Sequence, residues 1–176
     1  FKHVNTYFGR IHEPRFLSGL VAGVLSRSNL IGYVATFPTP DVLCGINAFA
    51  LGVRMVRPSA LISVEWTLKW DTARGVSQEP MERLAAQGAD LISHHNTLAN
   101  RKFAPEYGVF SITRDASGQI VPDRYLAVPV WNWGIFYEKV LRAILSGAMR
   151  TGADAASANT IRNYWWGMDS GLLDFF

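Results

Sequence analysis

The sequence predicts an α/β domain: a three-layer arrangement in which helices cover both faces of a largely parallel β-sheet. Two observations lead to this prediction. Segments whose apolar residues recur at helical spacing alternate with short apolar runs rich in β-branched and aromatic residues. The connections between these segments are short, which favours right-handed strand–helix–strand units and a parallel sheet.

Four segments have the pattern of amphipathic helices. Glu13-Pro14 starts the first, because proline is tolerated in the first turn, and we expect its large apolar residues, including Val24 and Leu25, to face inward. Thr39-Pro40 caps and opens the second helix, and Gly88 ends the third. The predicted helices cover residues 13–25, 40–53, 79–87 and 133–146.

Five segments have the pattern of strands. The run from Leu30 to Phe37 is continuously apolar and is closed by Pro38, which suits a strand buried on both faces. Asp115-Ala116-Ser117-Gly118 has the residues of a turn. The predicted strands cover residues 30–37, 61–66, 90–93, 109–113 and 125–130, and residues 151–159 are expected to form a loop or linker.

Composition excludes several classes of protein. Of the 176 residues, 49% are apolar and 18% are charged, and the formal charge is only +3. The basic residues are dispersed, so nucleic acid is not an expected partner. No apolar run approaches the roughly 18 residues of a membrane span. The lone Cys44 is expected to be a small core side chain on a helix.

Aromatic, acidic and amide residues stand where the predicted strands end. Ligands of open α/β sheets bind beyond the carboxyl ends of the strands. Flat aromatic faces can stack on a planar ring or a sugar, while carboxylates and amides fix its polar edge. The candidate ligand-binding residues are therefore Phe37, Trp70, His95, Asp115, Trp131 and Asn132.

Several of these residues also have a purely structural interpretation. Asp115 could simply cap the turn that follows it. Trp131 and Trp133 share a face of an extended chain, so one could stack on ligand while the other packs. Trp165 and Trp166 are interpreted as packing residues.

Catalysis is not indicated by the sequence, and neither a metal nor a cofactor is expected. His94 and His95 are adjacent, so on a strand they point to opposite faces and cannot reach one metal. Cys44 lies on an apolar helix face, and no serine stands in a Gly-x-Ser-x-Gly elbow. The glycine-rich stretches lie within helices, where a phosphate loop does not form.

Several motifs, taken in order, identify a family. They are Thr6-Tyr7-Phe8-Gly9-Arg10 with Phe16-Leu17-Ser18-Gly19, Ile31-Gly32-Tyr33-Val34 with Gly45-Ile46-Asn47-Ala48-Phe49, Ala86-Gln87-Gly88-Ala89-Asp90-Leu91-Ile92 with His94-His95, Val130-Trp131-Asn132-Trp133-Gly134, and Trp165-Gly167-Met168 with Gly171. Together they resemble the basic membrane lipoprotein receptors, the purine-nucleoside-receptor-like substrate-binding proteins of ABC transporters. The resemblance covers nearly the whole chain.

The resemblance implies a type I periplasmic-binding-protein fold whose two lobes close on a purine nucleoside or base. Residues 1–29 would then be a remnant of lobe one and a hinge helix, 30–132 the second lobe, and 133–176 a return segment toward lobe one. Trp70, Asp115 and Trp131 would contact the ligand. Trp131 stands where many nucleoside-binding members have lysine, which leaves a free base or another ring compound as alternatives.

We therefore expect a solute receptor for an ABC importer, with a purine-like or sugar-like ligand and an ABC permease as partners. It would be extracytoplasmic, either periplasmic or anchored as a lipoprotein. The alternative is a ligand-sensing domain of a transcriptional or signalling regulator, which would be cytoplasmic, because a fold alone does not fix function. The residues upstream of Phe1 in the gene would discriminate between the two: a lipoprotein signal against a DNA-binding helix-turn-helix.

Overall fold

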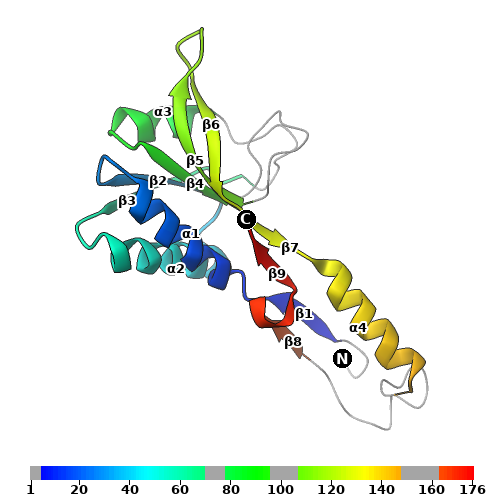
Figure 1. Ribbon diagram of the computed structural model, residues 1–176. Coiled ribbons are helices and arrows are strands. Elements are labelled where there is room, and N and C mark those ends of the chain that lie inside the picture. The colour runs from blue at the N-terminus through cyan, green and yellow to red at the C-terminus, as the bar shows by residue number, and fades with distance from the viewer. Residues whose placement is uncertain (1–4, 70–77, 96–106, 148–162) are drawn as a thin grey trace. The chain divides into compact units, whose positions relative to one another are not determined.

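The computed structural model describes residues 5–69, 78–95, 107–147 and 163–176 (Figure 1). The chain forms two compact units. The sheet unit comprises His12–Val130 and Phe175–Phe176, and the terminal unit comprises Phe1–Ile11 and Trp131–Asp174. The predicted lobe boundaries after residues 29 and 132 stay predictions, and the first helix is part of the sheet unit.

The sheet unit is built on five strands in the order β3-β2-β4-β5-β6. Their bounds are β2 Leu30–Ala35, β3 Leu61–Trp66, β4 Leu91–His95, β5 Tyr107–Arg114 and β6 Ile120–Ala127. The parallel prediction is confirmed for β3, β2 and β4. It is wrong for β5 and β6, which are antiparallel to their neighbours. The reason for β6 is the short turn after Arg114, which suffices for a hairpin but not for a parallel crossover.

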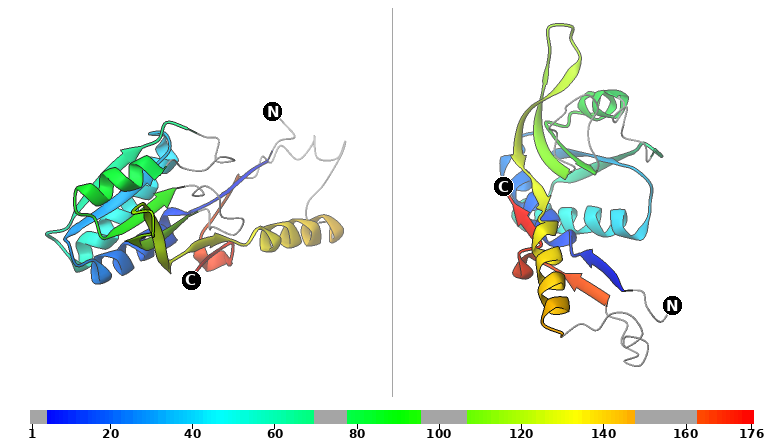
Figure 2. Two further views of the ribbon diagram at one scale, coloured as in Figure 1. Left: turned by 90° about the horizontal axis from the view of Figure 1, so that it is seen from above. Right: turned by 90° about the vertical axis from the view of Figure 1, so that its right-hand side faces the viewer.

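Helices cover both faces of this sheet, as predicted. Figures 1 and 2 show α1 (His12–Leu25) and α2 (Pro40–Val56) on one face and α3 (Gln78–Ala86) on the other. The core on the α1–α2 side is centred on Tyr33 of β2 and Phe49 of α2. The core on the α3 side contains Leu84 and Ile92. β2 is buried on both faces, as its continuous apolar run indicated.

Helices α1 and α2 approach each other through glycines rather than through large apolar side chains. A Cβ placed on Gly19 would lie 2.1 Å from the carbonyl oxygen of Phe49, and one on Gly52 would lie 2.1 Å from that of Phe16. The predicted inner face of α1 is therefore wrong. Val24 and Leu25 are 63% and 48% exposed, because the smaller residues of the helix occupy the contact.

Cys44 is also a correction. It lies on α2 as predicted, but it is exposed rather than part of the core. The buried side of α2 carries Val42, Gly45, Phe49, Gly52 and Val53. The close packing on α1 uses this glycine-bearing side, so the position next to Gly45 turns outward.

The terminal unit contains elements that the sequence did not predict. β1 (Thr6–Gly9) pairs in parallel with β8 (Asn163–Trp166), and the short helix η1 (Met168–Ser170) follows β8. Helix α4 (Trp133–Leu145) agrees with the prediction, and its Leu141 and Leu145 are 58% and 85% exposed. Tyr7 of β1 stacks on Phe136 of α4 with ring centroids 4.3 Å apart.

The carboxyl-terminal residues are held in place by strand pairing. β7 (Pro129–Trp131) pairs with β9 (Leu173–Phe175), and the backbones of Val128 and Phe176 exchange two hydrogen bonds. In the described part of the chain, no helix is both long and apolar enough to cross a bilayer. The loop predicted at 151–159 lies outside the described residues.

Candidate functional site

Two of the predicted ligand-binding residues lie at the carboxyl edge of the parallel strands. His95 is the last residue of β4, and the register that pairs Val34 with His94 places it beside Ala35 of β2. Phe37 follows two residues further along the chain and is half-buried. Since ligands of α/β sheets bind at this edge, these two residues define the candidate site.

Arg15 of α1 connects the helix layer to this edge. It is only 1% exposed, although arginine is almost never fully buried unless it is paired. Its Nη1 donates to the backbone oxygen of His94 at 3.1 Å, and its Nη2 lies 2.9 Å from Nδ1 of His95. Its guanidinium carbon is 5.5 Å from the ring centroid of Tyr33, within the range of a cation–π contact.

This contact fixes the protonation of the His95 ring. Arginine has only donors, so Nδ1 of His95 must accept, and the ring proton lies on Nε2. Burial lowers the pKa of His95 to about 3, with the charge of Arg15 and then His94 acting in the same direction. At neutral pH the ring is therefore neutral and carries one N–H donor of fixed position.

Buried hydroxyl groups lie below Arg15. Tyr33 of β2 and Ser93 of β4 are register partners, and both are fully buried. Neither hydroxyl oxygen has a hydrogen-bond partner within the described part of the chain. Burial raises the pKa of Tyr33, against the opposing charge of Arg15. Next to the edge, the buried guanidinium of Arg15 is therefore accompanied by the uncharged polar side chains of Tyr33, Ser93 and His95.

Sequence reasoning missed Arg15 and Tyr33, although a signal was present. Arg15, Gly19 and Gly23 recur every four residues, so they share one helix face. A charged residue in line with two helix-contact glycines indicates a buried, paired arginine. The large apolar residues of the helix also recur at helical spacing and predicted a different buried face.

His94 and His95 point to opposite faces, as predicted. His94 packs on the α3 side, 5.6 Å from the ring of Phe110 and 6.0 Å from that of Tyr125. His95 contacts Arg15 on the α1 side. Among the described residues, no group of three histidine, cysteine or acidic side chains could hold a metal ion.

The grouping of Asp115 with this edge is a correction. Because β5 is antiparallel to β4, Asp115 follows the end of β5 that lies at the amino-terminal end of β4. It accepts hydrogen bonds from Ser117 and Gln119 and thereby closes the β5–β6 turn, which Figure 2 shows at the tip of the hairpin. These bonds lower its pKa. A ligand contact by Asp115 stays an untested prediction, but the shared edge that motivated it does not exist.

Trp131 and Asn132 belong to the terminal unit. Trp131 stacks on Trp133 with ring centroids 4.7 Å apart, so the two indoles do share a face as predicted. A Cβ on Gly9 would lie 2.3 Å from the Trp131 ring, so the indole also packs closely on β1. Asn132 is exposed at the amino end of α4. Their contacts with ligand stay predictions, and Trp70 lies outside the described residues.

The sheet unit therefore has the architecture of a ligand-binding lobe: parallel strands covered on both faces, with a supported polar edge at their carboxyl ends. A family model described as ABC transporter substrate-binding protein PnrA-like matches residues 2–154. The chain belongs to this family, which confirms the resemblance found in the sequence.

Two curated relatives align with almost the whole chain. A putative ABC transporter glucose-binding protein of Haloferax volcanii is 36% identical over 97% of this chain and 41% of its own length. A purine-binding protein of Brucella abortus is 30% identical over 97% of this chain and 46% of its own length. The chain thus spans less than half the length of these two proteins.

Solved structures confirm the fold. An ABC transporter solute-binding protein from Conexibacter woesei superposes with a TM-score of 0.62 at 18% identity. The alignment covers 98% of this chain and 55% of that one. The mixed α/β architecture is therefore that of the solute-binding proteins.

Proposed function

We propose that the protein is the ligand receptor of an ABC importer and binds a purine base, a purine nucleoside or a similar ring compound. The observation that carries this proposal is the Arg15–His95 contact at the carboxyl edge of the parallel strands. It gives the edge a neutral ring donor whose orientation is held by a buried cation. A fixed donor is suited to one particular acceptor atom of a ligand.

The neighbouring aromatic residue supports a ring-shaped ligand. Phe37 follows β2 by two residues, and Ala35 at the end of β2 lies beside His95 in the register. The half-buried Phe37 ring can stack on a flat ligand face while His95 donates to a nitrogen or oxygen at the ligand's edge. The names of the relatives support two ligand classes, since one is a purine-binding and the other a glucose-binding protein. We favour the purine class because a neutral imidazole N–H matches the acceptor nitrogens of a purine. A sugar is the alternative.

Membership of the family supports the rest of the proposal. The ligand would favour a closed state that an ABC permease recognises. We place the protein outside the cytoplasm, either periplasmic or anchored as a lipoprotein, and assign it no catalytic step. Trp70, Trp131 and Asn132 are proposed as further ligand contacts. If the gene encodes a DNA-binding helix-turn-helix upstream of Phe1, the regulator alternative would replace the transport proposal.

Isothermal titration of the intact protein, stripped of ligand, tests this proposal. Adenine, guanine, adenosine, inosine and glucose form the panel. We expect a purine to bind, and His95→Ala to weaken it about tenfold or more, since a hydrogen bond in a desolvated site contributes roughly 1–3 kcal/mol. The control is Arg54→Gln on the exposed side of α2, which should leave the affinity unchanged.

The remaining outcomes decide the details. If glucose alone binds, the proposed ligand changes from a purine to a sugar and the receptor proposal stands. No heat signal with any member of the panel would contradict the receptor proposal. Incubation with adenosine or inosine should release no free base, and a steady release would contradict the absence of catalysis.

A further inference from the structure

A cavity lies in the sheet unit at the edge opposite the candidate site. It has a volume of about 340 Å³, within the roughly 300–1,000 Å³ of small-molecule sites. Its lining includes Leu25 at the end of α1 and Leu91 at the start of β4. His95 ends the same strand, so the two sites are about 13 Å apart along β4, at a rise of about 3.3 Å per residue.

An irregularity in β6 gives this cavity its charged wall. The pairing of β5 with β6 shifts register on both sides of Phe110, which inserts extra residues into β6. Strict alternation would turn Asp123 and Arg124 to opposite faces of the sheet. The bulged strand instead lets both side chains line the cavity, together with Leu126.

The charges of the lining balance, but they are not equally engaged. Asp90 accepts hydrogen bonds from Ser26, from the backbone of Arg27 and from Ser28. Burial alone would raise the pKa of Asp90, but these hydrogen bonds outweigh that effect and lower it, so the carboxylate is ionised. Both of its oxygens already accept hydrogen bonds. It holds the turn between α1 and β2.

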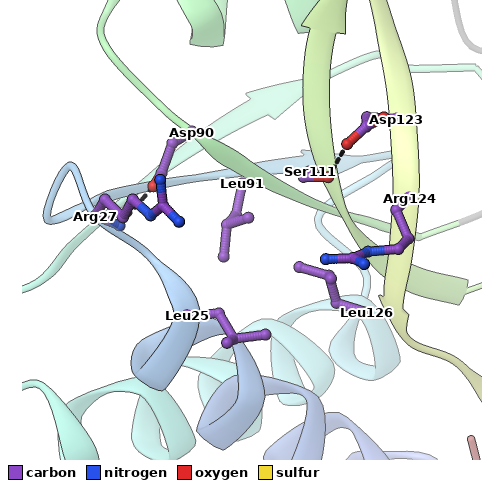
Figure 3. A pocket seen from close by; sticks show the side chains of 8 residues that line it. All are labelled: Leu25, Arg27, Asp90, Leu91, Ser111, Asp123, Arg124 and Leu126. Atoms are coloured by element: carbon purple, nitrogen blue, oxygen red, sulfur yellow. Dashed lines mark hydrogen bonds between the residues drawn. The ribbon is translucent and has the colours of Figure 1, made fainter.

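Three charged groups remain available. Within the described part of the chain, the guanidinium groups of Arg27 and Arg124 form no hydrogen bond or ion pair, and Asp123 uses only Oδ2, to accept from Ser111. Figure 3 shows the two arginines on opposite sides of the cavity, with Leu91 between them. Asp123 stands beside Arg124 on β6.

We propose that this cavity binds a free α-amino acid with an apolar side chain, as a site separate from the candidate site. The ligand carboxylate pairs with the guanidinium group of Arg124, and its ammonium group donates to Oδ1 of the neighbouring Asp123. Its side chain covers Leu25, Leu91 and Leu126. At Arg124 a simple anion would also meet the Asp123 carboxylate, and a simple cation at Asp123 would also meet the Arg124 guanidinium. A zwitterion satisfies both of these charges.

The three leucines of the cavity lining determine which zwitterionic ligands bind best. Leu25 is 48% exposed at the end of α1, so its side chain is still in contact with solvent. Leu126 is partly buried, and Leu91 is 4% exposed at the base. A ligand side chain that covers these leucines removes apolar surface from water, which favours leucine-like ligands over glycine.

Ligand-observed NMR with the intact protein tests this site. L-leucine should bind at millimolar concentrations. Its analogue without the ammonium group (4-methylpentanoate), its analogue without the carboxylate (isoamylamine), and glycine should each bind about tenfold more weakly or worse. Equal binding of 4-methylpentanoate and leucine, or no binding of leucine, would overturn the proposal.

Variants locate the binding. Arg124→Gln and Asp123→Asn are exposed substitutions that leave the core intact, and each should weaken leucine binding about tenfold. Arg54→Gln on the exposed side of α2 is the matched control and should have no effect. His95→Ala should also leave leucine binding unchanged. Leucine binding that depends on His95 and not on Arg124 would place the ligand in the candidate site and refute a second one.

Discussion

Replacing Gly52 by alanine should separate α1 from α2 and destabilise the sheet unit. The new Cβ would lie 2.1 Å from the carbonyl oxygen of Phe16 and 2.9 Å from the amide nitrogen of Leu20. Both are backbone atoms of α1, so no side-chain rotation relieves the contact, and the helices must move apart by about 1 Å to restore van der Waals distance.

The magnitude follows from two opposing effects. Overpacking of a core costs roughly 1–3 kcal/mol when side chains can adjust, and a clash between backbones lies at or above the upper end. Alanine recovers about 1 kcal/mol of helix propensity relative to glycine. We expect a net loss of about 2–3 kcal/mol, which lowers Tm by roughly 5–10 °C for a chain of this size. Thermal and urea unfolding followed by circular dichroism measure it.

Gly45→Ala on the same helix is the matched control. A Cβ on Gly45 would find its nearest neighbour, the Arg15 side chain, at an ordinary 3.8 Å. This variant should be unchanged or up to about 1 kcal/mol more stable, because only the propensity effect remains. Equal stability of the two variants would refute the conclusion that glycines set the distance between α1 and α2.

Two further predictions concern the polar layer at the candidate site. The pKa of His95 in the folded chain, about 3, lies below its unfolded value near 6.5, so stability is full above pH 6.5 and falls toward pH 3, by up to about 1.4 kcal/mol per pH unit. His95→Gln keeps an acceptor for Arg15 and should flatten this dependence in urea titrations at pH 7, 5.5 and 4.5; an unchanged slope would contradict the assignment. Tyr33→Phe removes a buried hydroxyl that has no partner in the described residues, so unfolding should cost about 0.5–2 kcal/mol more, whereas a loss of stability would reveal a bound water.

The order and type of the elements in the sheet unit could be predicted because each has a local cause. The residues of β2 form a continuous apolar run, so its burial on both faces follows from consecutive residues of the sequence. Thr39 and Pro40 begin α2, and Gly88, at φ 100°, ends the segment after α3 in a conformation that favours glycine. Such signals need no knowledge of the rest of the chain.

Features that depend on distant partners could not be predicted in the same way. β1 pairs with β8, so Thr6 meets Asn163 across almost the whole chain, and nothing in either segment specifies the other. The direction of β5 is of the same kind. Alternation of apolar residues indicates a strand but not whether it runs parallel to β4, and the position of Asp115 depended on that direction.

The candidate site could be predicted only where it depends on local signals at the ends of strands. His95 and Phe37 follow buried strands that really are parallel, so the rule for strand ends placed them correctly. Arg15 lies on a helix 80 positions away from His95, whereas the rule concerns only residues at strand ends. The rule therefore does not predict a contact from the helix layer to a proposed ligand-binding residue.

The glycine contact between the helices and the Arg15–His95 contact have one structural cause. Arg15 lies one turn before Gly19 on the same face of α1, and Gly19 allows that face to lie against α2. The close approach buries Arg15 over Tyr33 and brings its guanidinium to the end of β4. Larger residues at the glycine positions would lift α1 and withdraw Arg15 from His95. The ring would then lose the partner that fixes its proton on Nε2, so the packing of α1 on α2 and the orientation of the proposed His95 donor depend on the same small residues.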